Sequence, residues 1–160
     1  DGALHLSEYC LARLVSHQVM EALDPAKARP MGRRRLRDCQ AQLADLFAVH
    51  GVLDVGPHGG RWEGRAAIEN GLQAVVARTA AAGPGNSAGP VHHHVSSVLI
   101  TDVLGGRGRV RSYFAVHTAI GLDHWGRYFD RVELEIGRWK FTERMVVVDG
   151  SSPASLMVAR

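Results

Sequence analysis

The chain has 160 residues, of which 46% are hydrophobic and 22% charged, and its formal net charge is +3. This length and composition predict one compact domain with a sizeable core and argue against a second domain. No apolar run approaches the length of a membrane span, so no membrane-embedded segment is expected. The first residues lack the basic and apolar regions of a secretory signal, and the two cysteines, Cys10 and Cys39, are far apart. We therefore expect a cytoplasmic location.

A first helix is predicted over residues 7–23. Its apolar side chains recur every three or four residues, Ser7 can cap its start, and Asp24 followed by Pro25 ends it. The next segment, 25–37, carries six basic residues and two prolines. It could bind nucleic acid or a membrane surface, but no aromatic side chain lies between its arginines. A solvated basic loop is therefore favoured, and neither nucleic acid nor a membrane is an expected partner.

Two further helices and a short strand are predicted in the middle of the chain. Apolar side chains spaced by three and four residues indicate a second helix from Leu36 to about Val49, where His50 and Gly51 break the pattern. Residues 52–55 read as a short strand. The turn at 56–60 leads through Trp62 to Gly64, after which a third helix is predicted as far as Gly83.

From Val91 onward the apolar side chains alternate with a period of two. This pattern predicts long strands that are interrupted at residues 105–108, 120–125 and 136–137. Helices followed by an antiparallel sheet are typical of the α+β class.

Several segments of the chain together resemble a known family. They are Leu43-Ala44-Asp45-Leu46-Phe47, Gly51-Val52-Leu53-Asp54, Trp62-Glu63-Gly64-Arg65-Ala66-Ala67-Ile68, His93-His94-Val95-Ser96-Ser97-Val98, Gly126-Arg127-Tyr128-Phe129-Asp130 and Trp139-Lys140-Phe141. In order and spacing they look like the SnoaL-like branch of the nuclear transport factor 2-like superfamily. The resemblance implies a cone in which three N-terminal helices pack on a curved, mostly antiparallel sheet that encloses an apolar pocket. It covers most of a single domain, residues 1–160, with an insertion at about 25–37 and a short tail after 149.

This superfamily includes polyketide cyclases, scytalone dehydratase, steroid isomerases and proteins without known activity, so the fold does not name the reaction. The resemblance implies an acid–base enzyme without a cofactor, of dehydratase, isomerase or cyclase type. Its expected substrate is a small hydrophobic oxygenated ring compound such as a polyketide, steroid or terpenoid. A homodimer or higher homo-oligomer is expected, because relatives commonly associate through the outer face of the sheet. The alternative is a domain of the same fold that binds a small molecule or a partner without catalysis.

His93 and Asp24 are the predicted catalytic residues. In this resemblance His93 matches the first histidine of a His-hydrophobic-Val-Ser motif, and Asp24 matches an aspartate that faces the pocket from the end of the first helix. The basic insertion moves the next acidic position to Asp38. An imidazole held by a carboxylate can accept and return a proton at neutral pH. Asp24 is equally well explained as a turn residue before Pro25.

Other side chains are predicted to contact the substrate. Strict alternation on one strand would put Ser97 on the same face as His93, as a second polar contact. The resemblance places Tyr128, Val55, Phe114 and Trp62 in or beside the pocket. The dehydratase has polar residues where this chain has Gly126 and Tyr128, and a tyrosine where it has Val55, which argues against that enzyme's own reaction. Asp130 and Arg144 are expected to form a structural ion pair.

The three consecutive histidines raise the alternative of a metal site. His92 and His94 share a strand face, and His117 or His50 could supply a third ligand. Such a site needs a carboxylate a few residues after the histidines, but the next acidic residue, Asp102, lies near the predicted end of the strand. We therefore expect no metal and no other cofactor.

Overall fold

The computed structural model describes residues 39–81 and 91–155. Asp24, the predicted first helix and the basic segment 25–37 lie outside the described residues. The elements are α2 (Cys39–Ala44), β1 (Phe47–Asp54), the 3₁₀ turn η2 (Gly56–His58), β2 (Arg61–Glu63), α3 (Arg65–Ala81), β3 (His92–Leu104), β4 (Arg107–Thr118), β5 (Gly121–Glu135) and β6 (Arg138–Ser151).

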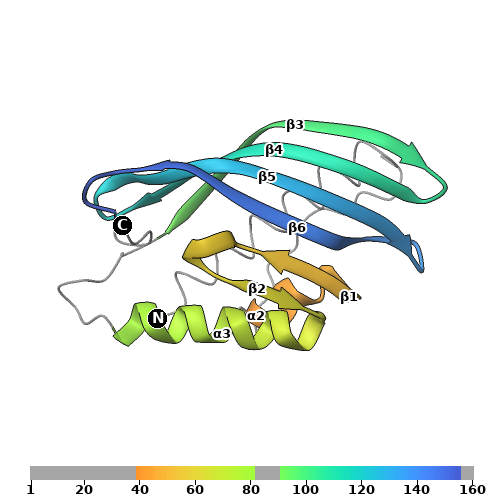
Figure 1. Ribbon diagram of the computed structural model, residues 1–160, viewed down its shortest axis with the longest axis horizontal. Helices are drawn as coiled ribbons and strands as arrows, with labels where there is room; N and C mark the ends of the chain where they lie inside the picture. The colour runs from red at the N-terminus through yellow and green to blue at the C-terminus, as the bar shows by residue number, and fades with distance from the viewer. Residues whose placement is uncertain (1–38, 82–90, 156–160) are drawn as a thin grey trace.

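The strands form one six-stranded sheet in the order β2-β1-β6-β5-β4-β3. Only β1 and β6 run parallel among the described strands, and the other neighbours are antiparallel. The long strands β3–β6 curve over β1, β2 and the helix α3, as Figure 1 shows. This is the predicted α+β class. Two α-helices, α2 and α3, lie within the described residues, so three helices are not confirmed, and neither of the two is long and apolar enough to span a membrane.

The second predicted helix is wrong over its last five residues. The helix α2 ends at Ala44, and a strand begins at Phe47. The physical reason is the pairing of this segment with β6, where the Phe141 N–H donates a hydrogen bond to the carbonyl of Leu46. That carbonyl is then not available to accept a helical hydrogen bond. The spacing of apolar residues in this short segment suits a helix or a strand, and the pairing with β6 decides for the strand.

The third predicted helix is confirmed as α3, which starts directly after Gly64. Its Gly71 lies against the indole of Trp62, and a Cβ added at Gly71 would lie 2.3 Å from the indole Cε2. The absence of a side chain therefore lets Trp62 of β2 pack flat on the helix.

The buried face of the long strands, called the inner face below, carries two apolar clusters. The first joins α2 and α3 to β1 and to one end of the sheet. Its buried members are Leu43, Ala44, Phe47, Leu53, Ile68, Leu72, Val110, Val132 and Phe141. The second cluster lies further along the sheet and consists of Val91, Phe114, Val116 and Tyr128. The polar side chains of the candidate site lie around this second cluster.

The strand β5 begins at Gly121, so the predicted break over residues 120–125 is wrong apart from its first residue. Val116 of β4 pairs with His124, and the next residue, His117, pairs with Leu122. Asp123 is therefore the extra residue of a β-bulge. Because Asp123 and His124 are both buried, the period-two pattern fails at this point and resembles a loop in the sequence.

Candidate active site

Two histidines lie in one row across the inner face of the sheet. His93 of β3 pairs with Val116 of β4, and Val116 pairs with His124 of β5. Paired residues point to the same face of a sheet, so both imidazoles share the face of the fully buried Val116. Two strand spacings of about 4.8 Å set their backbones about 10 Å apart.

His93 is partly buried as a residue, and both nitrogens of its ring are fully buried. Neither ring nitrogen contacts solvent, and neither is hydrogen-bonded within the described part of the chain. Burial is the main cause that lowers the pKa of His93 from 6.5 to about 3, and the nearby charges of His124, Arg144 and His94 contribute to the same shift. The imidazole is therefore neutral at pH 7, and two polar atoms are left for a further group to satisfy. Asp24, its predicted partner, stays a prediction.

A buried aspartate–histidine pair lies at the start of β5. The Nδ1 atom of His124 is 2.8 Å from Oδ1 of Asp123. Asp123 is fully buried and His124 nearly so. Asp123 also accepts hydrogen bonds from the hydroxyls of Thr118, at 3.3 Å, and Ser155, at 2.6 Å. This pair was not among the predicted site residues, although an adjacent Asp and His inside an apolar stretch are a signal of it in the sequence.

Aromatic side chains form an apolar surface next to His124. The rings of Phe114 and His124 meet edge-on with centroids 5.9 Å apart, and Phe114 stacks on Tyr128 at 4.5 Å. Gly126 lies under the Phe114 ring, because an added Cβ would lie 2.9 Å from two of its carbons. Phe114 and Tyr128, both predicted to line the site, therefore lie together beside one of its imidazoles.

The predicted ion pair between Asp130 and Arg144 is confirmed. Nε and Nη2 of Arg144 donate to the two carboxylate oxygens of Asp130 at 2.8 and 2.7 Å, and both residues are buried. The guanidinium also lies 4.6 Å from the centre of the Tyr128 ring. Burial alone would lower the pKa of Arg144, but the charge and hydrogen bonds of Asp130 outweigh it and leave this pKa raised. The pair therefore fixes a permanent positive charge beside Tyr128.

Three predicted contact residues do not join this group. The predicted face of Ser97 is wrong, because a bulge in β3 puts Ser97 at a φ of 52° and leaves its side chain exposed. After the bulge Val98 takes the partly buried position instead. Val55 and Trp62 pack against the first apolar cluster with the helices, whereas Phe114 and Tyr128 belong to the second.

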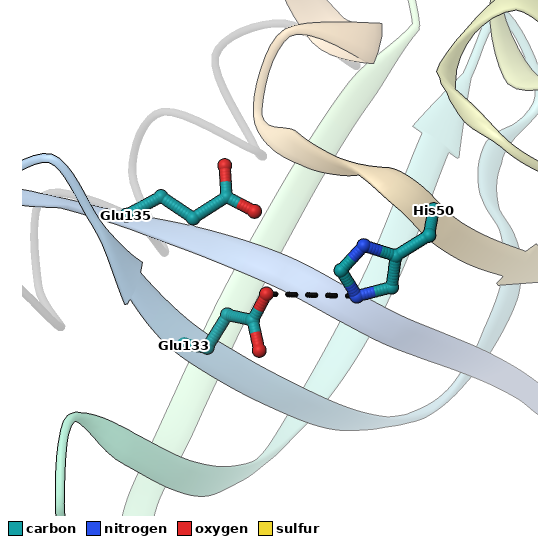
Figure 2. Close-up of side chains that lie close together, drawn as sticks. All are labelled: His50, Glu133 and Glu135. Carbon is teal, nitrogen blue, oxygen red and sulfur yellow. Dashed lines mark ion pairs between the residues drawn. The ribbon is translucent and has the colours of Figure 1, made fainter.

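The histidines of the metal alternative lie on the outer face. His92 pairs with His117, and the rings of His94 and His117 are 5.0 Å apart. Among the described residues the only three potential ligands that converge are His50, Glu133 and Glu135, with ligand atoms within 4.8 Å of one another (Figure 2). His50 is 69% exposed and lies 3.5 Å from Glu133, the geometry of an ordinary hydrated ion pair.

Comparisons with known proteins agree with this architecture. The model of a family described as a SnoaL-like domain matches residues 37–145. A proposed scytalone dehydratase from Novosphingobium aromaticivorans is 21% identical with a TM-score of 0.60, and the match covers 95% of this chain and 94% of that one. A protein of unknown function with a cystatin-like fold from Nostoc punctiforme is 17% identical with a TM-score of 0.59, covering 89% and 90%.

A protein of unknown function from Mycobacterium tuberculosis is 23% identical with a TM-score of 0.56, and the match covers 76% of this chain and 70% of that one. No curated protein matches the sequence. Likenesses at these identities establish the cystatin-like, nuclear transport factor 2-like fold and leave the reaction to be argued from the site.

Proposed function

The chain belongs to the SnoaL-like domain family, and from this premise we propose that it is a cofactor-independent acid–base enzyme. Its substrate is a small hydrophobic ring compound that carries a carbonyl or hydroxyl group, of polyketide, steroid or terpenoid type. The reaction is an elimination of water, an isomerisation or an aldol-type ring closure, each of which needs only proton transfers.

The observation that carries this proposal is the state of His93. A buried imidazole with both nitrogens unsatisfied among the described residues costs stability, and such a cost is typical of functional sites. A carbonyl or hydroxyl of a bound ring would supply the missing hydrogen bond. The neighbouring rings of Phe114 and Tyr128 offer an apolar surface for the rest of such a compound.

The experiment is to incubate the protein with a panel of polyketide, steroid and terpenoid ring compounds and to analyse both binding and products. We compare the wild type with His93→Ala, and with His94→Ala as a control on the opposite face of the same strand. Turnover that disappears only in His93→Ala, while binding persists, supports the enzyme. Binding by all three proteins without turnover favours the alternative, a binding domain of the same fold.

We also propose that the protein forms a homodimer through the outer face of the sheet. Leu99, Tyr113 and Met145 expose 55%, 55% and 41% of their surface there. Exposed apolar side chains on one face of a sheet favour association with a second copy. Sedimentation equilibrium of the wild type and of Tyr113→Lys tests this, and a wild-type monomer at high concentration contradicts it.

A further inference from the structure

We propose that His124, oriented by Asp123, is the general base of the site, and that His93 instead donates a hydrogen bond to the substrate oxygen. This inference rests on the proposed function and deepens it. It assigns the proton transfer to a residue outside the expected pair of His93 and Asp24.

The contact with Asp123 sets the tautomer of His124. A carboxylate only accepts hydrogen bonds, so the contact of 2.8 Å with Asp123 requires the hydrogen on Nδ1 of the imidazole. In the neutral ring Nε2 then carries the lone pair. Within residues 39–81 and 91–155 no hydrogen bond to Nε2 is present, so no described residue occupies this lone pair.

Hydrogen bonds hold Asp123 in place. Its carboxylate is held by the hydroxyls of Thr118, at the end of β4, and Ser155, in the C-terminal segment. Its backbone carbonyl accepts a hydrogen bond from the Ser152 N–H at 2.7 Å. A carboxylate fixed in this way keeps an imidazole in one tautomer and orientation and stabilises the imidazolium that forms on protonation, as in hydrolase triads. Asp123 is therefore a positioning residue for His124.

His93 has a different role from His124. Because burial lowers its pKa to about 3, His93 binds protons too weakly to serve as the base at neutral pH. A neutral imidazole can still donate a hydrogen bond from one nitrogen to an oxygen on which negative charge develops. His124 is paired with a carboxylate, whereas His93 has no described hydrogen-bond partner. Such a difference in surroundings assigns different roles to two titratable groups of one site.

The proton transfers balance without any further reactant. Nε2 of His124 takes a proton from the carbon next to the substrate carbonyl, and the C–H electron pair forms a carbon–carbon double bond. The carbonyl π electrons move onto oxygen, which His93 stabilises by its N–H. The imidazolium of His124 then returns the proton to another ring carbon, or to a hydroxyl that leaves as water. The row that holds both histidines sets their backbones about 10 Å apart, a span that one substituted ring can bridge.

The test begins with the full-length protein labelled with ¹⁵N in histidine. Long-range proton–nitrogen NMR spectra at pH 7.5 distinguish the two neutral tautomers and the imidazolium. We expect His124 in the Nδ1–H form in the wild type, and a shift toward the Nε2–H form in Asp123→Asn. Asp149→Asn, which removes an exposed carboxylate paired with Arg127, is the control and should leave the His124 signals unchanged. An Nε2–H tautomer or an imidazolium in the wild type overturns the proposal, even if Asp123→Asn does not fold.

The second part uses any compound of the panel that the wild type converts. We expect kcat to fall at least 100-fold in His124→Gln, with a smaller change in KM, the effect expected from removing a general base. If the wild type turns over but His124→Gln retains its kcat, the assignment of the base is wrong and the proposed function stands. If the wild type converts none of the panel while it binds ligands, the proposed function fails, and the base assignment fails with it.

Discussion

The burial of His93 predicts that the protein loses stability in mild acid and that a single substitution removes much of this loss. We consider His93→Leu, which replaces the imidazole by an apolar side chain of similar volume. The pKa of His93 is about 3 in the folded protein, against 6.5 in the absence of burial. Above pH 6.5 the imidazole is neutral in both states and has no effect on the pH dependence of stability. As the pH falls from 6.5 toward 3, only the unfolded chain gains the proton, so the free energy of unfolding decreases.

The magnitude follows from the two pKa values. Each pH unit within this window lowers the free energy of unfolding by about 1.4 kcal/mol, so that wild type at pH 5 is about 2 kcal/mol less stable than at pH 7.5 on account of His93 alone. His93→Leu lacks this loss. It also removes two buried polar atoms without partners, so we expect it to be about 1–3 kcal/mol more stable than wild type even at pH 7.5.

The assay is urea unfolding of wild type and His93→Leu, followed by tryptophan fluorescence at pH 7.5, 6.0 and 5.0. The stability difference between the two proteins should widen by about 2 kcal/mol from pH 7.5 to 5.0. His92→Leu changes an exposed histidine on the other face of β3 and should keep the wild-type slope. Parallel pH profiles for wild type and His93→Leu would contradict this prediction, because they mean that His93 has the same proton affinity in the folded and unfolded states.

Three other substitutions test the packing around the site. Arg144→Met leaves the carboxylate of Asp130 buried without its charge partner and should lower the free energy of unfolding by about 3–5 kcal/mol in the same urea assay. The double variant Asp130→Leu/Arg144→Met removes both charges and should recover most of this loss. Gly126→Ala should cost about 1–3 kcal/mol, because the new Cβ would lie 2.0 Å from the Val147 carbonyl oxygen, and an unchanged melting temperature would contradict the close packing. His50→Ala removes an exposed ion pair and should change stability by less than about 0.5 kcal/mol, with a larger loss indicating a buried role.

Regular patterns in the sequence predicted most of the described fold. The helix that became α3 and the turn at Ile136-Gly137 were predicted correctly, and the predicted break over residues 105–108 is a turn at its first two residues only, since β4 begins at Arg107. Helical spacing and paired turn residues act over a few neighbouring positions. The ion pair of Asp130 and Arg144 was also expected, since both fall on alternating positions of neighbouring strands. The resemblance to the SnoaL-like branch agrees with the family match over residues 37–145.

The predictions failed wherever the chain departs from a strict period. The bulge at Ser97 exchanges the faces of the residues that follow it in β3, as far as a second irregularity between Thr101 and Leu104, and the bulge at Asp123 buries two consecutive side chains of β5. A bulge depends on how one strand meets its neighbour, and a one-residue shift in register exchanges the faces of a strand. The pairing of β1 with β6 also depends on segments that are distant along the chain. It ends α2 at Ala44, before the predicted helix end at about Val49.

Residue type and short-range spacing are enough to specify the order of the helices and strands and the presence of titratable side chains among apolar ones. Which of those side chains meet depends instead on contacts between segments that are distant along the chain. The register of β3, β4 and β5 puts His93 and His124 in one row, and the folded C-terminal segment brings Ser155 to Asp123. Burial then makes His93 a neutral imidazole, since the cost of a charge depends on the three-dimensional surroundings that remove water from it.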